Sequence, residues 1–206
     1  LILSAAIIFL VAGVNKMGLT AFLGSFSGIG TAALLSVFFT RNLHLHGAVL
    51  PFAETLLYSG YNHLNITRIF VGAIFIAACG AIMDLSMDVS AAMHEVKKKK
   101  PDIGILEIIQ SGFFVSRAVL GTMTTTLLFA YSGSYITLLM AFMAQNIPVV
   151  NIVNLVYVSS EIIKILVGSF GLVLVAPFTA IIGGFIYGNV NPLTLILRRY
   201  KRASDL

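Results

Sequence analysis

Long apolar segments separated by short polar stretches run along the chain and predict a series of membrane-spanning helices. A helix needs about 20 predominantly apolar residues to cross the hydrocarbon core of a bilayer. Four such segments occupy the first two thirds of the chain, and the first of them is short. We expect these helices at residues 1–14, 18–40, 66–94 and 105–131.

The tract from residue 133 to residue 190 is apolar and is interrupted mainly at QNIP (145–148) and GSFG (168–171). Pro and Gly commonly end or bend a helix. We therefore expect three further spans, at residues 133–147, 149–167 and 169–189. An alternative with a single span in this tract, accompanied by a re-entrant or surface helix, stays open.

Small residues in TAFLGSFSGIG, within the second predicted helix, indicate close contact with another helix. Gly24 and Gly28 lie four residues apart and therefore on one helix face. Small residues let two membrane helices approach closely. We interpret this face as a packing surface.

The segment 41–65 is mixed in polarity, and we expect an interfacial loop with a short helix. His44, His46 and His63 lie in this segment together with Glu54. A His-x-His pair can supply two metal ligands, but a complete site needs further ligands from the same loop. We therefore expect neither a metal nor a cofactor.

The composition identifies the class of protein. Of the 206 residues, 58% are hydrophobic and 10% are charged, whereas soluble domains carry roughly 25% charged residues. We predict an all-α, polytopic transmembrane helix bundle of six or seven spans, with residues 1–206 forming one domain in the lipid bilayer. Binding of nucleic acid is excluded because no soluble basic face is present. The chain does not start with Met, so we expect further residues upstream.

Basic residues cluster in KKKK (97–100) and in RRYKR (198–202). Cytoplasmic loops of membrane proteins carry an excess of Lys and Arg. We expect both clusters on the cytoplasmic side, so the chain between them must cross the membrane an even number of times. This parity favours seven spans with an outside start, and it places Lys16 inside as well.

Two aspartates stand in the third predicted helix, in AIMDLSMDVS. Asp84 and Asp88 lie four residues apart and share one face, with Asp84 deeper in the membrane. A charged residue at the centre of a membrane helix costs roughly 2.5–3.5 kcal/mol on insertion scales. Each carboxylate must therefore be protonated, paired or in contact with water.

Arg117, in the next predicted helix, is a candidate partner for these acids at a similar depth. A static Asp–Arg pair would lock two neighbouring helices together. A water-filled inner vestibule, or coupling to an ion or substrate, would explain the same residues. Two carboxylates against one arginine leave one acid without a counter-charge, which keeps the coupling role open.

Hydroxyl side chains follow Arg117 in GTMTTT, where Thr122, Thr124 and Thr125 lie near the middle of the predicted span. Threonine hydroxyls can donate to carbonyls of their own helix. They can also line a pathway for an ion. Both interpretations stay open.

A second polar stripe runs through residues 149–167, where Asn154 and Glu161 lie at helical spacing and Lys164 follows Glu161 by three residues. Glu161 and Lys164 can neutralise each other. This stripe either lines a cavity or packs at the membrane interface.

No nucleophile elbow, phosphate loop or HExxH motif is present in the sequence. We therefore expect no enzyme activity and no catalytic residues. The polar residues within the membrane favour a transporter or permease component for an ion or small solute. The alternative is a non-transporting scaffold or accessory subunit, in which a partner membrane subunit or a homo-oligomer completes the assembly.

Three motifs resemble the YibE/F family of bacterial multi-pass membrane proteins: GAIMDLSMDVSAAMHEV, SRAVLGTMTTTLLFAYSG and SSEIIKILVGSFGLVLVAPFTAII. The resemblance places the family's conserved-motif positions on Gly80, Asp84, Ser90, residues 121–124, Pro177 and Thr179. Asp88 and Ala118 depart from the family pattern. The resemblance implies a bacterial plasma membrane location, and it implies no specific activity.

Overall fold

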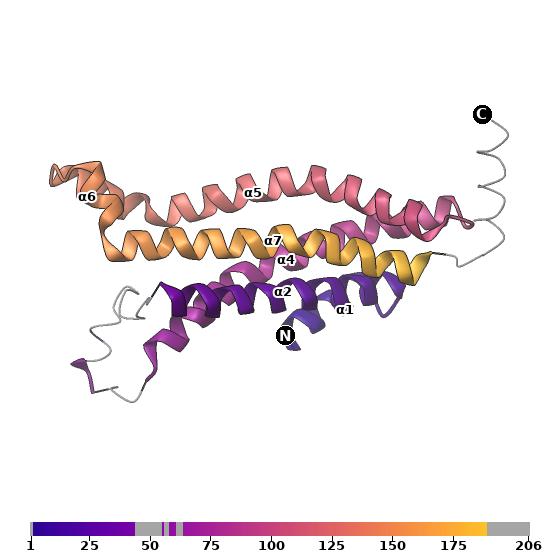
Figure 1. Ribbon diagram of the computed structural model, residues 1–206, viewed down its shortest axis with the longest axis horizontal. Coiled ribbons are helices and arrows are strands. Elements are labelled where there is room, and N and C mark those ends of the chain that lie inside the picture. Colours follow the sequence, from indigo (N-terminus) through magenta and orange to yellow (C-terminus); the bar gives the residue numbers. More distant parts are fainter. Residues whose placement is uncertain (1, 44–54, 56–57, 61–63, 189–206) are drawn as a thin grey trace. The chain divides into compact units, whose positions relative to one another are not determined.

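The computed structural model describes residues 2–43, 55, 58–60 and 64–188. Helices account for most of these residues, which confirms the predicted all-α class (Figure 1). Their bounds are α1 (Ile2–Ala12), α2 (Lys16–Asn42), α4 (Ile66–Lys99), α5 (Ile105–Ala144), α6 (Val149–Asn154) and α7 (Val156–Tyr187).

Four of the helices in the described part of the chain are long and apolar enough to cross a membrane: α2, α4, the Ile105–Ala130 part of α5, and the Val158–Tyr187 part of α7. Two shorter apolar helical segments, Ile2–Ala12 and Tyr135–Ala144, accompany them. We expected six or seven spans. The first expected span corresponds to the short helix α1, and the other differences arise in the last third of the chain.

The expected break after residue 131 is absent, because α5 continues as one helix of 40 residues to Ala144. The expected break at GSFG is absent as well, because α7 runs unbroken for 32 residues and contains Pro177. Gly171 marks close packing instead of a turn: a Cβ atom at this position would lie 2.7 Å from Cβ of Ala32 in α2. A glycine inside an apolar run thus indicates either a turn or a helix contact, and the contact is present here.

The break at QNIP is confirmed. Asn146 has a positive φ of 54°, its N–H donates to the carbonyl of Met143, and the Ile147 N–H donates to the carbonyl of Phe142. These two bonds form a Schellman motif, in which a residue in the left-handed conformation ends a helix. Pro148, which cannot continue the ladder, follows directly.

The chain divides into two compact units, and α2, α4, α5 and α7 each contribute a segment to both. The first unit comprises residues 1–26, 83–119 and 175–206, and the second comprises residues 27–82 and 120–174. Each unit has its own packing and is described separately.

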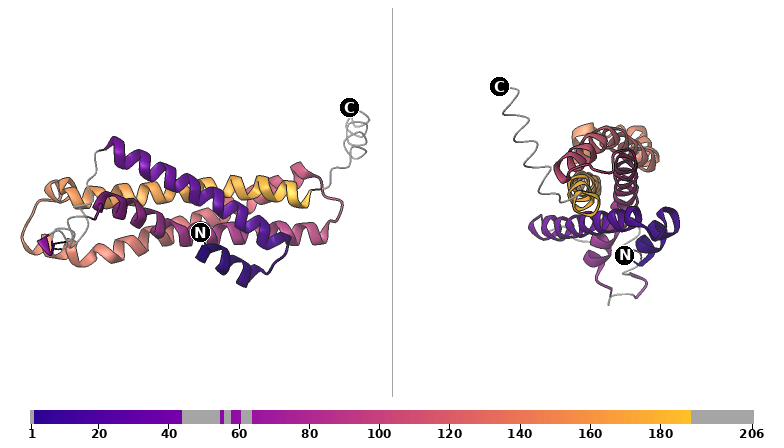
Figure 2. Two further views of the ribbon diagram at one scale, coloured as in Figure 1. Left: turned by 90° about the horizontal axis from the view of Figure 1, so that it is seen from below. Right: turned by 90° about the vertical axis from the view of Figure 1, so that its right-hand side faces the viewer.

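In the first unit, segments of α4, α5 and α7 lie side by side (Figures 1 and 2), and glycines leave room for side chains of a neighbouring helix. Met93 of α4 is 1% exposed. A Cβ atom at Gly112 in α5 or at Gly183 in α7 would lie 2.9 Å and 2.8 Å, respectively, from the Met93 sulfur. The Met93 side chain therefore fills the space that the two glycines leave.

The contact between α2 and α7 in the first unit depends on Gly24, because a Cβ atom there would lie 2.9 Å from Cβ of Thr179. This confirms the predicted packing role of Gly24. A hydrogen bond from the Ser90 hydroxyl to the Met17 carbonyl (2.7 Å) joins α4 to the start of α2. Gly28 is buried as predicted, and it lies in the second unit.

The second unit has a hydrophobic core of three buried side chains, Phe70 and Ile74 from α4 and Val167 from α7. Leu35 and Phe39 of α2 and Ile163 of α7 pack against it, partly buried. The spacing of these residues follows the helical period on each helix, which is the expected pattern for helices packed in a bundle.

The start of α5 and the end of α7 lie at the same end of the first unit, where Gly188 approaches Ile105. The lysines at 97–100 precede α5 directly, so the end of α7 lies near this basic turn. Between them the chain forms α5, α6 and α7. The even number of crossings that the charge pattern requires stays a prediction. The cluster at 198–202 lies outside the described residues.

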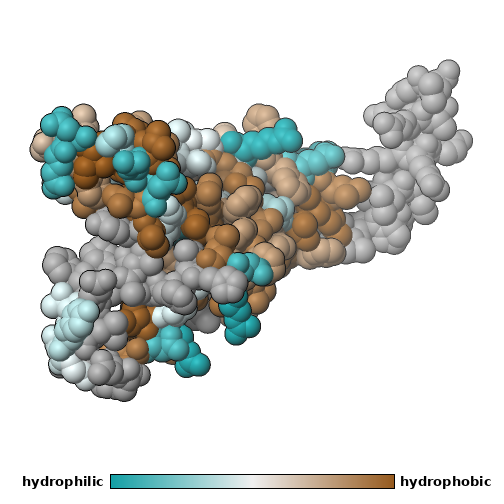
Figure 3. All heavy atoms as spheres, turned by 60° about the vertical axis from the view of Figure 1, so that its left-hand side comes forward, coloured by the Kyte–Doolittle hydropathy of each residue, from teal (hydrophilic) through white to brown (hydrophobic). Residues whose placement is uncertain are grey.

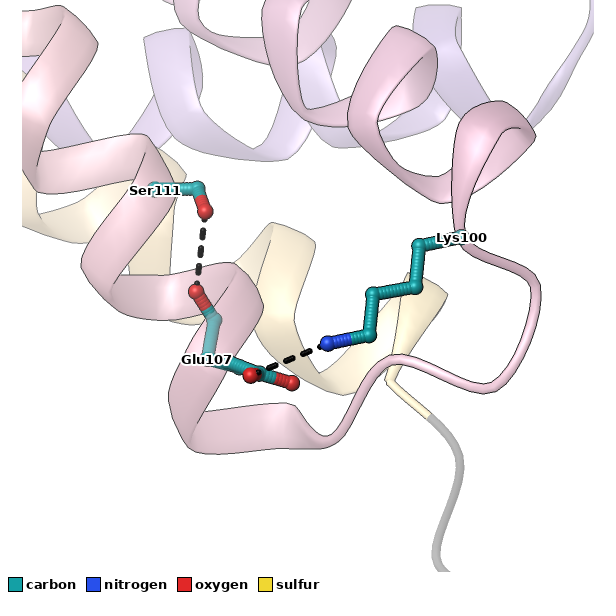
Figure 4. Close-up of polar contacts among 3 residues, drawn as sticks. All are labelled: Lys100, Glu107 and Ser111. Carbon is teal, nitrogen blue, oxygen red and sulfur yellow. Dashed lines mark hydrogen bonds and ion pairs between the residues drawn. The ribbon is translucent and has the colours of Figure 1, made fainter.

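Contacts of the basic side chains reinforce the turn between α4 and α5. Lys97 Nζ donates to the carbonyl oxygen of Pro101 (2.6 Å). Lys100 Nζ pairs with Glu107 Oε1 (3.1 Å), and the Ser111 hydroxyl donates to the Glu107 carbonyl (3.0 Å), as Figure 4 shows. This ion pair holds Lys100 against the first turn of α5. The negative charge of Glu107 in that turn is also favourable for the dipole of α5.

The variant Gly24→Ala is expected to lower the stability of the protein in detergent. The added methyl group would overlap Thr179, and overpacking of this kind costs about 1–3 kcal/mol. Gly30→Ala is the matched control on the same helix, because nothing lies within 4 Å of a Cβ atom there. The measurement is the midpoint of thermal unfolding. Equal midpoints for the two variants would contradict the packing role of Gly24.

Candidate functional site

Asp84 and Asp88 lie on a face of α4 that no other helix in the described part of the chain covers. Both residues are exposed, whereas Leu85, Val89 and Ser90 are buried on the packing face of the same helix. The rotation of about 100° per residue separates these two faces. The two carboxylates therefore share a face, as predicted, and both belong to the first unit.

Arg117 lies on an uncovered face of α5 in the same unit. The buried stripe of this helix consists of Ile108, Gly112 and Ser116, at a spacing of four residues. Arg117 follows this stripe by one residue and is exposed, next to Phe114, which is 79% exposed. The packing of α5 thus turns the guanidinium away from the helix neighbours.

The predicted ion pair within the chain is not formed. Among the residues that the structure describes, no salt bridge joins Arg117 to Asp84 or to Asp88. All three side chains are exposed within one unit, so the structure does not support a static lock between α4 and α5.

The threonines of α5 lie in the second unit and are exposed. The Thr125 hydroxyl donates to the carbonyl of Thr122 (2.8 Å). The Thr126 hydroxyl donates to the same carbonyl (2.9 Å). This confirms the predicted bonding of hydroxyls to their own helix. Thr124 is exposed on the same helix.

Asn154 and Glu161 do not share one helix face, because Leu155 separates α6 from α7 with an extended backbone (ψ 130°). The Asn154 side-chain amide donates to the Val150 carbonyl at the end of α6 (2.8 Å). The predicted continuous stripe through 149–167 is therefore interrupted.

Glu161 forms the predicted ion pair with Lys164, with 2.6 Å between Oε2 and Nζ. The side chains are 10% and 15% exposed, respectively. Tyr135 of α5 adds a hydrogen bond from its hydroxyl to the Glu161 carboxylate. Sequence reasoning missed Tyr135, because its partner lies on another helix and no local pattern points to it.

Groups of three or more His, Cys, Asp or Glu side chains with the geometry of a metal site are absent from the described part of the chain. His44, His46, His63 and Glu54 lie outside it. His94 lies in the first unit, where its ring is 5.8 Å from that of Tyr187.

The surroundings of these polar residues are apolar. On the face drawn in Figure 3, hydrophobic side chains cover most of the described surface, and hydrophilic ones form separate patches. Such a surface suits a protein whose solvent is lipid. Carboxylates on an exposed face of a membrane helix are costly to keep charged in hydrocarbon, so they mark a candidate functional site.

Comparison with known proteins identifies one family. A family model described as YibE/F-like protein matches residues 1–189. Neither curated proteins nor solved structures give a match to the chain.

Removing the charge of Glu161 is expected to destabilise the second unit. Glu161→Gln leaves the ammonium of Lys164 buried without a counter-charge, and breaking a buried pair in this way costs about 3–5 kcal/mol. The double variant Glu161→Gln, Lys164→Met should cost less than Glu161→Gln alone. The measurement is equilibrium unfolding in mixed micelles of increasing denaturing-detergent fraction.

Lys100→Gln is the matched control, because it removes an exposed ion pair with Glu107, whose side chains are 57% and 30% exposed. An exposed pair contributes up to about 1 kcal/mol. If Glu161→Gln and Lys100→Gln lower the unfolding free energy equally, the Glu161–Lys164 pair has no structural role.

Proposed function

The chain belongs to the YibE/F-like family, and on that premise we propose that it is a membrane transporter, or the transport component of a larger permease, for an ion or small solute. In this function Asp84 exchanges a proton or a cation as the coupling group. Arg117 and Asp88 adjust its electrostatic surroundings from the same unit.

The observation that carries this proposal is that the Asp84 carboxylate is exposed and has no ion pair among the described residues. The carboxylate lies within an apolar span, on an uncovered face, and without an ion pair in the described part of the chain. A purely structural carboxylate would be expected to have its charge neutralised by a neighbour, because an isolated charge in hydrocarbon is costly. A carboxylate that binds and releases a proton or cation needs access to that ion instead.

The second acid strengthens the argument for ion binding. Asp88 lies one helical turn from Asp84 on the same face, and two like charges at this spacing repel each other. Two carboxylates at this spacing attract a cation more strongly than a single carboxylate does. A single arginine can offset one of the two charges.

The threonines support a pathway only through their oxygen lone pairs. The hydrogens of Thr125 and Thr126 are used within their own helix. Their oxygens can still accept a hydrogen bond or coordinate a cation.

The basic turn at 97–100 supports an orientation for the chain. Helix α2 begins at Lys16, and the hydrogen bond from Ser90 of α4 to the Met17 carbonyl holds this start against α4. Lys16 therefore lies toward the end of the first unit that carries the basic turn. We place this end in the cytoplasm, because positive charge accumulates there. The membrane would be the bacterial plasma membrane, as the family resemblance implies.

A second function, that of an accessory subunit in a larger membrane complex, is favoured by α5. Only 6% of the residues in the most apolar window of α5 are buried, against 33% in α2, 33% in α4 and 44% in α7. A helix this open has room for another protein chain. Both functions are compatible with the same fold.

The variant Asp84→Asn is expected to abolish coupled ion flux while the protein still inserts and folds. The assay uses purified protein in liposomes that contain a pH-sensitive dye, with Na⁺ or K⁺ gradients imposed at several pH values. Asp102→Asn, in the exposed turn before α5, is the matched control and should keep the wild-type rate. Equal flux in Asp84→Asn and wild type, or the absence of wild-type flux under every gradient, would contradict the proposal.

A further inference from the structure

The first unit presents opposite charges on uncovered faces of two neighbouring helices. Asp88 is exposed on α4, and Arg117 is exposed on α5. Lipid tails offer neither a counter-charge nor a hydrogen bond. Both side chains therefore favour a protein partner that supplies the opposite charge within the membrane.

The two charges lie at nearly the same depth. Asp88 precedes the end of α4 at Lys99 by 11 residues, and Arg117 follows the start of α5 at Ile105 by 12 residues. At 1.5 Å per residue these separations are about 16 Å and about 18 Å. The short turn at 100–104 joins the two helices, so each distance is measured from the same end of the unit.

Equal depth makes this surface complementary to itself. Two copies of a membrane protein share one orientation, so a two-fold axis relating them runs along the membrane normal. Such an axis keeps every residue at its own depth, and each contact occurs twice. An acid and a base can then pair between copies only if they lie at one depth, which is the arrangement of Asp88 and Arg117.

We propose that the uncovered faces of α4 and α5 in the first unit bind a second copy of this chain, with Asp88 of each copy paired to Arg117 of the other. The interface contains two such ion pairs. Both charges that the pair requires are present on one chain, which favours a second copy over a different subunit. This interface does not depend on the proposed transport function.

The flanking residues suit a helix contact in a membrane. Phe113 and Phe114 are 39% and 79% exposed beside Arg117, and they provide apolar area next to the charged group. A charge pair that is sheltered by apolar side chains interacts more strongly than a hydrated one. Asp84, deeper by one turn, stays without a partner in this arrangement.

Charge reversal tests the interface. Tagged and untagged copies are expressed together, and the amount of untagged protein that is purified with the tagged copy is measured in bilayer nanodiscs and by single-molecule photobleaching. Asp88→Arg alone, or Arg117→Asp alone, in both copies should reduce this amount to background, because like charges then meet. Asp102→Arg, a charge reversal in the exposed turn, should leave it at the wild-type level.

The decisive experiment combines the two single variants in different copies. A tagged Asp88→Arg copy faces an untagged Arg117→Asp copy, so that both positions pair opposite charges again, one pair with reversed polarity and the other with the native polarity. Association should return to the wild-type level, although neither variant associates with itself. Pairing within one chain cannot give this result. Size-exclusion profiles of each variant report whether it is folded. The milder single variants Asp88→Asn and Arg117→Gln remove one charge each, and each should weaken association less than the charge reversal at the same position.

The proposal is overturned if the wild-type protein is a single copy in the nanodisc, including the case in which a different membrane protein accompanies it. It is also overturned if folded single variants associate as the wild type does, or if the mixed pair fails to recover association.

Discussion

Close helix packing at positions without a side chain is the constraint on which the first unit depends. Gly24 lets α2 contact Thr179 of α7, and Gly112 and Gly183 make room for Met93 of α4. Lipid surrounds a membrane protein with material as apolar as its own core, so close van der Waals contact, rather than exclusion of water, holds such helices together. The glycine faces therefore determine which side of each helix points inward.

The orientation of the charged residues follows from this packing. Because α5 turns its stripe of Ile108, Gly112 and Ser116 inward, Arg117 points away from its neighbours. Because α4 turns Leu85, Val89 and Met93 inward, the two aspartates point away as well. The charged groups are thus available for an ion, for water or for another chain, and they do not stabilise the helix hairpin that carries them.

The helical class, the helices at the start of the chain and the end of α5 at Ala144 could be predicted from the sequence. Apolar run length, helical periodicity and the Asn and Pro of QNIP are local signals. The continuity of α7 could not be predicted, because a glycine such as Gly171 indicates a helix break unless its contact with Ala32 of α2 is known. The Glu161–Lys164 pair was predictable because its members lie one turn apart on one helix. The contact of Tyr135 with Glu161 joins two helices, and a single sequence contains no local pattern for it. For the same reason, the direction in which Asp88 and Arg117 point could not be predicted from the sequence, and their similar depth in the membrane stays a prediction.

The length of α5 has a consequence for the way the protein meets its surroundings. Its 40 residues extend for about 60 Å at 1.5 Å per residue, whereas the hydrocarbon core of a bilayer is about 30 Å thick. Membrane helices tilt by up to about 40°, so a helix of this length cannot lie wholly within the hydrocarbon core. Part of α5 therefore extends into the headgroup region or the water at one end or at both, where lipid head groups, soluble proteins or proteases can reach it without entering the bilayer.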